Sequence, residues 1–297
     1  MKNNFLYFLL FISFFSNIFT QSDNYENMWL SFPACHMGRL QSPVRLNISE
    51  SKYSNSFSIV YQYFDEIKLS NSSEGKIFHT QSKPSRKFEV DSGSGSGSGY
   101  INLQRNGVIK QYSFSHVEMF RGLHKVESSK SEFEVHLIFE KVLGFSTNQN
   151  QYRRITDTNN YLAIVLRYNN SNSKTATQTS SIQLASDGGL LDKLMDGEKI
   201  NFNDFPIFDR RAFFYEGSQI YNPCSEDYNY IVLYDTFKST EDVKQIVAKS
   251  DWAVREFAHS YDRPIYRNFM NYTETISSGF LKINLIKIIG FLSIILL

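Results

Sequence analysis

The chain has 297 residues, 41% of them hydrophobic, so it is long enough to bury a large core in one or two domains. Its formal net charge is +1, and no basic run supplies the phosphate-neutralising surface that nucleic acid requires, so nucleic acid is excluded as a partner. No internal repeat and no linker-like boundary divides the sequence, so we expect one globular unit between its two ends.

The N-terminal segment predicts a secretory signal peptide. Lys2 precedes a mostly apolar run that ends at Phe19, and polar sequence begins at Gln21. This order is typical of a cleaved leader, which we place at residues 1–20, followed by a domain over residues 21–277. A buried first helix is the alternative, and it fits less well because the run is apolar on nearly every side.

Strand-like stretches dominate the middle of the chain, because β-branched and aromatic residues are concentrated in them. They span residues 57–64, 100–114, 133–142, 161–168 and 230–237. Helical periodicity is confined to residues 190–197 and 240–260. The pattern indicates a β-dominated α+β domain.

A Gly/Ser run of low complexity, residues 92–99, interrupts the strand pattern. Such a composition behaves as a flexible coil. We interpret it as a tolerated loop insertion, with a flexible binding loop as the alternative, and we assign it no function.

The C-terminal segment predicts a glycolipid (GPI) anchor signal. A small-residue cluster around Ser278 is followed by a short spacer and by an apolar tail over residues 288–297. This order is typical of a GPI signal, which we place at residues 278–297. A tail-anchored span and a packed terminal helix are the alternatives. A span needs about 20 apolar residues, and Lys287 interrupts any window of that length.

The segment Tyr112–Glu140 reads YSFSHVEMFRGLHKVESSKSEFEVHLIFE and contains two predicted strands. It resembles the zinc-binding core of the alpha-class carbonic anhydrases. In that family one strand offers two histidines one residue apart, and the facing strand offers a third inside a Glu-x-His-Leu string. Alternate residues of a strand face the same way, so the three imidazoles complete an open tetrahedral zinc centre.

Four more blocks resemble the same family and follow in its order. They are WLSFPACHMGRLQSPVRL at residues 29–46, NNYLAIVLRY at 159–168, FYEGSQIYNPCSEDYNYIVL at 214–233, and KSTEDVKQI followed by DRP within 238–264. The resemblance covers about residues 25–270, nearly the whole mature chain. It implies the alpha-carbonic anhydrase fold, a large central twisted and mostly antiparallel sheet with short peripheral helices.

The resemblance places Glu118 and Phe120 at the first two ligand positions and leaves His136 as the matching histidine. A carboxylate binds zinc in other enzymes, but a phenyl ring has no lone pair and fills the space of a ligand. His116 is a candidate extra ligand, because it lies two residues before Glu118 and could share its face. We therefore expect no metal cofactor, with zinc as the alternative. Without a metal, we expect Glu118 to form a salt bridge or a hydrogen bond with His136.

The resemblance also implies that the pair of residues that orients the zinc-bound hydroxide is lost. The family places a threonine hydroxyl and a partner glutamate there, and this chain has Ile220 and Leu123, with Tyr221 at the next threonine. Losing both partners together avoids leaving one of them buried and unsatisfied. Glu134 and His124 match residues that support the ligands from behind, and we expect them to keep a structural role.

Two cysteines in a secreted chain usually pair. Cys35 and Cys224 fall at the positions that form the single disulfide of extracellular members of the family, so the resemblance implies this bond. Asn-x-Ser/Thr sequons fit passage through the secretory pathway. They lie at Asn47, Asn71, Asn169 and Asn271.

We therefore predict a carbonic anhydrase-related domain on the outer cell surface, catalytically inactive and acting as a binding or structural module. Its partner is an unknown extracellular protein or ligand, since a fold permits this role without naming the partner, and it contacts the membrane through the C-terminal anchor. The alternative is an atypical active carbonic anhydrase that interconverts CO₂ and bicarbonate with Glu118, His136 and His116 on a metal. A small-molecule site in the former metal cone is a third possibility, which Phe120 and Ile220 disfavour.

Overall fold

The structure, a computed structural model, describes residues 38–55, 57–71, 86–90, 99–142, 159–170, 184–185, 188–205, 210–221, 224–239 and 263–270. Within these ranges, no helix is long and apolar enough to cross a lipid bilayer. Several predicted features lie outside the described residues: the signal peptide, the Gly/Ser run except Gly99, the helical pattern of residues 240–260 and the GPI signal.

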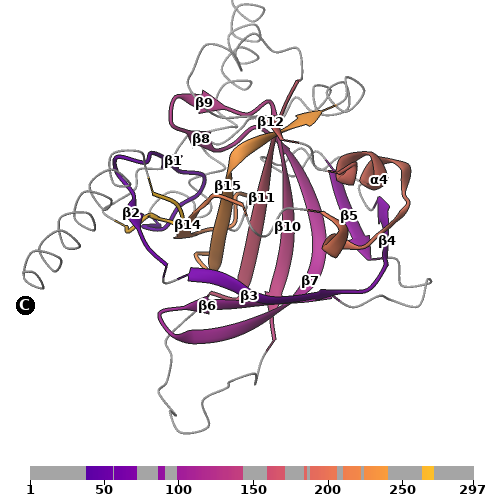
Figure 1. The fold of residues 1–297 in the computed structure, drawn as a ribbon, viewed down its shortest axis with the longest axis horizontal. Helices are drawn as coiled ribbons and strands as arrows, with labels where there is room; N and C mark the ends of the chain where they lie inside the picture. The colour runs from indigo at the N-terminus through magenta and orange to yellow at the C-terminus, as the bar shows by residue number, and fades with distance from the viewer. Residues whose placement is uncertain are drawn as a thin grey trace, which may run out of the picture.

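One large sheet forms the body of the fold, and its long strands run side by side through the middle of Figure 1. The longer strands are β3 (Phe57–Phe64), β4 (Ile67–Asn71), β5 (Arg86–Val90), β6 (Gly99–Arg105), β7 (Val108–Arg121), β10 (Phe133–Lys141), β11 (Tyr161–Asn170), β14 (Ala212–Gly217) and β15 (Tyr228–Ser239). The short ones are β2 (Lys52–Tyr53), β12 (Leu184–Ala185), β13 (Lys199–Ile200) and β16 (Tyr266–Arg267). A separate small sheet joins β1 (Arg45–Leu46), β8 (Lys125–Val126) and β9 (Ser129–Lys130).

Hydrogen-bonded neighbours in the large sheet follow the order β13-β4-β5-β7-β10-β11-β15-β14-β16-β2, with β3, β6 and β12 attached beside this path. Strand β15 is parallel to β11 and β12, and β16 is parallel to β2, while the other pairs are antiparallel. Helix α4 (Leu190–Asp196) and the 3₁₀ turn η1 (Phe202–Asp204) lie at the side of the sheet, on the right of Figure 1. The predicted large, mostly antiparallel sheet with short peripheral helices is confirmed.

Strand β10 shows how the sequence divides the sheet into two buried faces. Successive side chains point to opposite sides of a strand. Val135 and Leu137 join the larger hydrophobic cluster on one face, which we call the main-core face. Ile138 joins a smaller cluster on the other, which we call the site face, and His136 points the same way by alternation. Because both faces are covered, β10 and β11 read as nearly continuous apolar runs.

The predicted strands match the observed ones closely where they are described. β3 has the predicted bounds, and the predicted helix at residues 190–197 is α4. The predicted stretch 100–114 divides into β6 and β7 at Asn106 and Gly107, whose φ angles are 49° and 78°. An Asn-Gly pair with positive φ is the favoured two-residue hairpin turn, because its backbone twist matches that of the flanking strands.

The turn between β7 and the small sheet requires a glycine at Gly122. Its backbone N–H donates to the carbonyl of Glu132, and a Cβ added at Gly122 would lie 1.8 Å from the backbone oxygen of Ser131. We therefore expect Gly122→Ala to lower the free energy of unfolding by at least about 2 kcal/mol, because backbone must move to relieve the contact. Urea unfolding followed by far-UV circular dichroism measures the loss.

The matched control is Gly107→Ala, where φ is positive but no atom lies within 4 Å of the added Cβ. This change should cost only about 1 kcal/mol, the strain of a left-handed backbone with a side chain. Equal losses in the two variants would contradict the close approach at Gly122.

Candidate functional site

Two neighbouring strands bring the three predicted ligand positions together. In the antiparallel pair β7 and β10, Glu118 lies opposite His136 and Phe120 lies opposite Glu134. All four residues are buried, and alternation puts them on the site face. We call the place where Glu118, Phe120 and His136 meet the cone.

Phe120 fills part of the cone with hydrocarbon. Its ring centroid lies 4.7 Å from that of the His136 imidazole and 6.4 Å from that of Tyr221, and only 4% of the residue is exposed. Phe120 also belongs to the hydrophobic cluster of the site face, together with Ile220. The second ligand position therefore holds a packed aromatic ring.

Glu118 is held by partners other than the expected one. Its Oε1 accepts a hydrogen bond of 2.5 Å from the Tyr221 hydroxyl and lies 3.2 Å from Nε2 of His116. The expected contact between Glu118 and His136 is wrong, because Nε2 of His136 bonds Glu134 at 3.0 Å instead. Sequence reasoning had no signal for the bond from Tyr221, which depends on how the loop after β14 folds over β7.

His116 does reach the neighbourhood of Glu118, as its spacing suggested. The pairing of β7 with β10 skips Ser115, an irregularity typical of a β-bulge. The Ser115 hydroxyl lies 2.9 Å from Nδ1 of His116 and donates to the carboxylate of Glu140 at 2.9 Å. Both nitrogens of His116 are thus within hydrogen-bond distance of protein groups.

Behind the cone, the buried Glu134 carboxylate accepts five hydrogen bonds. Its Oε1 accepts from the backbone N–H groups of Leu123 at 3.0 Å and His124 at 2.6 Å, and from the Ser131 hydroxyl at 3.3 Å. Its Oε2 accepts from Nδ1 of His124 at 2.8 Å and from Nε2 of His136 at 3.0 Å. Burial opposes ionisation of Glu134, but its interactions with His124 and His136 outweigh this and lower its pKa.

The hydrogen-bond network continues from Glu134 through His124 to Tyr215 and Ser42. Burial lowers the pKa of His124, so its imidazole is neutral and one ring nitrogen must accept a hydrogen bond. Nδ1 donates to Glu134, and Nε2 accepts from the Tyr215 hydroxyl at 2.7 Å. Tyr215 also lies 3.3 Å from the hydroxyl of Ser42. Glu134 and His124 thus belong to one buried hydrogen-bond network.

Arg167 is the buried cation of this region, and sequence reasoning missed it. It lies directly opposite Glu134 on β11 and has no exposed surface. Its guanidinium donates to the backbone carbonyls of Tyr234 at 3.0 Å and Ser129 at 3.2 Å. Burial lowers the pKa of Arg167 to about 10 while Glu134 raises it, so the guanidinium stays charged at neutral pH. The sequence signal that could have identified Arg167 is its position as the single charged residue in the apolar strand pattern YLAIVLRY.

The two positions predicted to have lost the hydroxide-orienting pair are both apolar and buried. Ile220 and Leu123 belong to the same hydrophobic cluster on the site face. The backbone N–H of Leu123 bonds Glu134, which fixes this residue next to His124 in the network. Neither side chain offers a hydroxyl or carboxylate, so neither can orient a bound polar group.

Stacked tyrosines form the remaining wall of the site. Ring centroids of Tyr161 and Tyr228 are 4.8 Å apart, those of Tyr228 and Tyr230 are 5.8 Å apart, and those of Tyr230 and Tyr215 are 4.9 Å apart. Burial raises the pKa of each of these four phenols, and burial with the Glu118 charge does the same for Tyr221. All five hydroxyls therefore stay protonated at neutral pH, and no phenolate is present to act as a base or ligand.

His124, Glu134 and His136 form a group whose nitrogen and oxygen atoms all lie within 4.8 Å of one another, close enough to hold a metal ion. In the structure, however, both imidazoles donate hydrogen bonds to Oε2 of the same carboxylate. A metal would have to displace those protons and the backbone donors that occupy Oε1. The group is therefore a closed hydrogen-bond network.

The remaining predicted residues fall at several places. Cys224 is buried and disulfide-bonded, while Cys35 lies outside the described residues. Asn47 and Asn169 are buried, and Oδ1 of Asn169 accepts a hydrogen bond from the backbone N–H of Glu132, which makes both poor acceptors for a glycan. The side chain of Asn71 and the whole of Asn271 lie outside the described residues.

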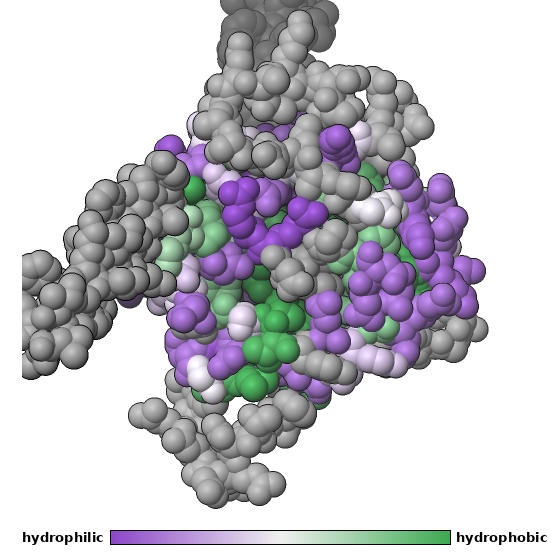
Figure 2. All heavy atoms as spheres, viewed as in Figure 1, coloured by the Kyte–Doolittle hydropathy of each residue, from purple (hydrophilic) through white to green (hydrophobic). Residues whose placement is uncertain are grey.

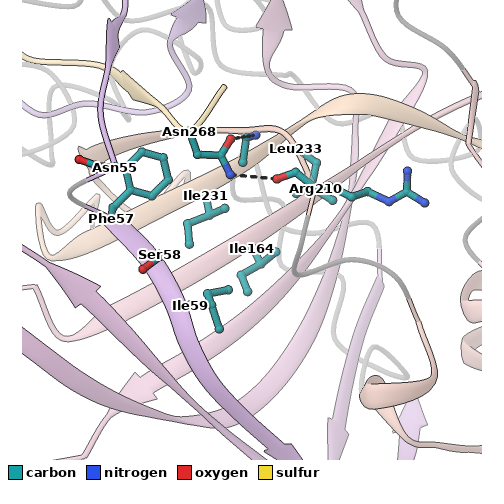
Figure 3. Close-up of a pocket in the computed structure, with 10 residues that line it drawn as sticks. Asn55, Phe57, Ser58, Ile59, Ile164, Arg210, Ile231, Leu233 and Asn268 are labelled. Atoms are coloured by element: carbon teal, nitrogen blue, oxygen red, sulfur yellow. Dashed lines mark hydrogen bonds between the residues drawn. The ribbon is translucent and has the colours of Figure 1, made fainter. Parts of the chain in front are cut away.

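A cavity of about 300 Å³ lies on the main-core face, away from the cone. Figure 3 shows Ile59, Ile164 and Ile231 pointing into it from β3, β11 and β15, while the guanidinium of Arg210 extends away. Asn268 closes one side by accepting from the backbone N–H of Ala212 and donating to the carbonyl of Arg210. In Figure 2, hydrophobic atoms form a patch in the lower middle of the face, where β3 crosses the other strands.

Comparison with known proteins gives a family and a set of solved structures. A family model described as eukaryotic-type carbonic anhydrase matches residues 24–271, and no curated protein matches the chain. Dioscorin in complex with ascorbate is similar with a TM-score of 0.56 and 14% identity, over 84% of this chain and 94% of that chain. The Photobacterium profundum alpha-carbonic anhydrase is similar with a TM-score of 0.53 and 14% identity, over 81% and 95% of the two chains. The alpha-carbonic anhydrase of Thermovibrio ammonificans, in complex with the inhibitor sulfanilamide, has a TM-score of 0.50 and 15% identity, over 79% and 90%.

The network around Glu134 predicts a large effect of removing its charge. Glu134→Gln replaces one acceptor oxygen by an NH₂ group that would face N–H donors, so we expect the free energy of unfolding to fall by about 3 kcal/mol or more. Glu140→Gln on the same strand is the matched control, because Glu140 is exposed and should contribute less than about 1 kcal/mol. Urea unfolding of both variants measures the two changes in the free energy of unfolding. Equal small decreases would show that Glu134 does not stabilise the site.

Proposed function

Because the chain belongs to the eukaryotic-type carbonic anhydrase family, we propose that it is a member that no longer hydrates CO₂ and serves as a binding or structural module on the outer cell surface. The observation that carries the proposal is the Phe120 ring, packed 4.7 Å from the His136 imidazole at the position of a metal ligand. A phenyl ring has no lone pair, so no small movement can make Phe120 a metal ligand. A displaced histidine, by contrast, could move back to bind a metal.

The residues of the cone do not fit the zinc of this family. Alpha-carbonic anhydrases bind zinc through three histidine nitrogens. Here the cone offers one imidazole, His136, and one carboxylate, Glu118, which already accepts a hydrogen bond from Tyr221. His116 would be needed as a third ligand, but its Nε2 lies at hydrogen-bond distance from Glu118 itself. A set of one imidazole and one engaged carboxylate is too small for a zinc enzyme.

The apolar pair of Ile220 and Leu123 supports the same proposal independently. In the family the corresponding hydroxyl and carboxylate orient a metal-bound hydroxide. Both positions have become part of one hydrophobic cluster with Phe120. Catalysis would therefore need a substitution at each of these positions. Burial of an apolar side chain in this cluster stabilises the folded protein by about 1.5–3 kcal/mol.

A binding role is supported by related folds and by the cavity of Figure 3. Dioscorin, which shares the fold, forms a complex with ascorbate, so a domain of this architecture can hold a small organic molecule. In this chain the cavity beside Ile164 and Ile231 is concave and mostly apolar, the character of many ligand sites. The cone is a poorer candidate, because Phe120 and Ile220 are packed into it.

Display on the cell surface is supported by the sequence. Residues 1–20 have the order of a signal peptide, and residues 278–297 have that of a GPI signal. The disulfide at Cys224 suits an oxidising compartment. The partner in this setting is an extracellular protein or ligand.

The first test is metal content and activity. The purified domain, residues 21–277, should contain no stoichiometric zinc by elemental analysis and should hydrate CO₂ no faster than buffer in a stopped-flow assay. The reason is that Glu118 and Phe120 stand at two of the three ligand positions. One zinc ion per chain together with sulfonamide-sensitive hydration would contradict the proposal and favour the alternative of an atypical active enzyme.

Restoring the ligands should restore metal binding before it restores activity. In Glu118→His with Phe120→His, we expect one zinc ion per chain, because β7 and β10 keep their register and Glu134 still supports His136. Turnover should stay low, since Ile220 and Leu123 cannot orient a hydroxide. Adding Ile220→Thr and Leu123→Glu should raise the rate by about 10²–10³-fold.

The matched control is Glu118→Gln with Phe120→Leu, which changes the same positions without adding ligands and should bind no zinc. A folded double-histidine variant without zinc would contradict the convergence of the three positions. A double-histidine variant as fast as the quadruple variant would contradict the role given to Ile220 and Leu123.

A further inference from the structure

The cavity of Figure 3 lies along one edge of strand β3. It is lined by three consecutive residues of that strand, Phe57, Ser58 and Ile59. Successive side chains of a strand point to opposite sides, so three in a row meet one cavity only where the cavity abuts the strand's edge. No residue of β6, which pairs with β3, lines the cavity, so this is the edge away from β6. The cavity therefore borders a strand edge whose backbone N–H and C=O groups no described strand pairs with.

The floor of the cavity is aliphatic. Ile164 of β11 and Ile231 and Leu233 of β15 line it, and all three are buried members of the cluster on the main-core face. Ile59 points toward this floor from β3, on the opposite side of the cavity. A molecule with a hydrocarbon body would exchange water for hydrocarbon contacts here, which is the favourable direction of the hydrophobic effect.

The rim of the cavity is polar, and its charged side chain turns outward. Asn55, Ser58 and Asn268 are exposed there, and Asn268 is held by two hydrogen bonds to backbone. Among the lining residues only Arg210 is charged. Its guanidinium lies 4.9 Å from the ring centroid of Phe237 and extends away from the cavity. An ionised ligand would therefore lose water inside the cavity without gaining a counter-charge, so the cavity favours a neutral one.

The size of the cavity suits a small molecule. Its volume is about 300 Å³, the lower end of the range for ligand sites. One water molecule takes roughly 30 Å³ in the liquid, so there is room for about ten non-hydrogen atoms of a ligand. An added peptide strand fits less well. The pairing of β3 shifts between Ile59 and Tyr61, an irregularity typical of a β-bulge, which interrupts the regular edge that such a strand needs.

We infer that this cavity binds a small neutral molecule that has an aliphatic body and one hydroxyl or carbonyl group. The body lies against Ile59, Ile164 and Ile231, and the polar group bonds the backbone edge of β3 or the Ser58 hydroxyl. The inference rests on the binding role proposed above, for which it names the site and the class of ligand. It is separate from the loss of catalysis, because a zinc ion in the cone would leave this cavity unchanged.

The test uses 1-octanol as the ligand and octanoate as its charged counterpart. The purified protein is labelled with ¹³C at the δ1 methyl groups of isoleucine, and each compound is titrated at neutral pH. Octanol should shift the signals of Ile59, Ile164 and Ile231 and leave those of Ile138 and Ile220, on the site face, in place. Octanol should bind at least about tenfold more tightly than octanoate, because the carboxylate must be desolvated.

Two variants that fill the cavity make the test specific. Ser58→Trp adds an indole at the exposed rim, and Ala212→Leu adds volume at a buried lining residue. Each should weaken octanol binding by about tenfold, because the added atoms occupy the ligand's space. Val60→Trp is the matched control for Ser58→Trp, since Val60 is exposed on the same strand but does not line the cavity, and it should bind octanol normally. The methyl spectrum of each variant shows whether it is folded.

Several results would overturn the inference. They are the absence of a shift up to the solubility limit of octanol, equal shifts at the cavity and on the site face, equal affinity for octanoate, and normal binding by both folded filling variants. Shifts of the three cavity methyl signals with protein concentration alone would show that a second copy of the chain covers the cavity, and would also overturn it. Zinc content measured on the same sample reports separately on the proposed loss of catalysis.

Discussion

The site depends on one buried carboxylate, Glu134. An ionised group without exposed surface is tolerated only when donors surround it, and Glu134 has five of them together with the charge of Arg167 on the next strand. These bonds fix the turn after β7 through the backbone of Leu123 and His124, and they orient the imidazole of His136. Because β7, β10 and β11 must all be in register to satisfy one carboxylate, the supporting network constrains the sheet whether or not a metal is bound.

Under the function proposed above, this constraint explains how the site could lose its metal ligands and keep its shape. The side chains that support the ligands are also those that satisfy buried charge, so replacing them would cost stability. Glu118 bonds Tyr221 and His116, and Phe120 and Ile220 are apolar, so a change at any of the three removes no hydrogen-bond donor from Glu134. Two of them have become part of a hydrophobic cluster, and the third, Glu118, is held by Tyr221 and His116. The cone is therefore filled by the apolar side chains of Phe120 and Ile220, while Glu118 within it is hydrogen-bonded.

Much of this arrangement could be predicted from the sequence, because alternation and the histidine pattern are local properties. The resemblance to the carbonic anhydrases placed Glu118, Phe120 and His136 in one site, and the observed register of β7 and β10 brings these positions together. The Asn-Gly pair that forms the β6–β7 turn was a local signal within the single stretch predicted for residues 100–114. The partner of Glu118 could not be predicted, since Tyr221 reaches it from a loop far along the chain. The role of Arg167 depends equally on a cross-strand neighbour, and spacing within one strand carries no information about either contact.

The central claim is that the cone is occupied by the Phe120 ring and does not hold zinc. Anomalous diffraction at the zinc edge, from crystals of the purified domain grown with excess zinc, tests it at the level of atoms. The account predicts no anomalous peak within coordination distance of His136 and continuous density for the Phe120 ring beside its imidazole. A strong peak bound by His136, Glu118 and His116, with the Phe120 ring turned aside, would contradict it.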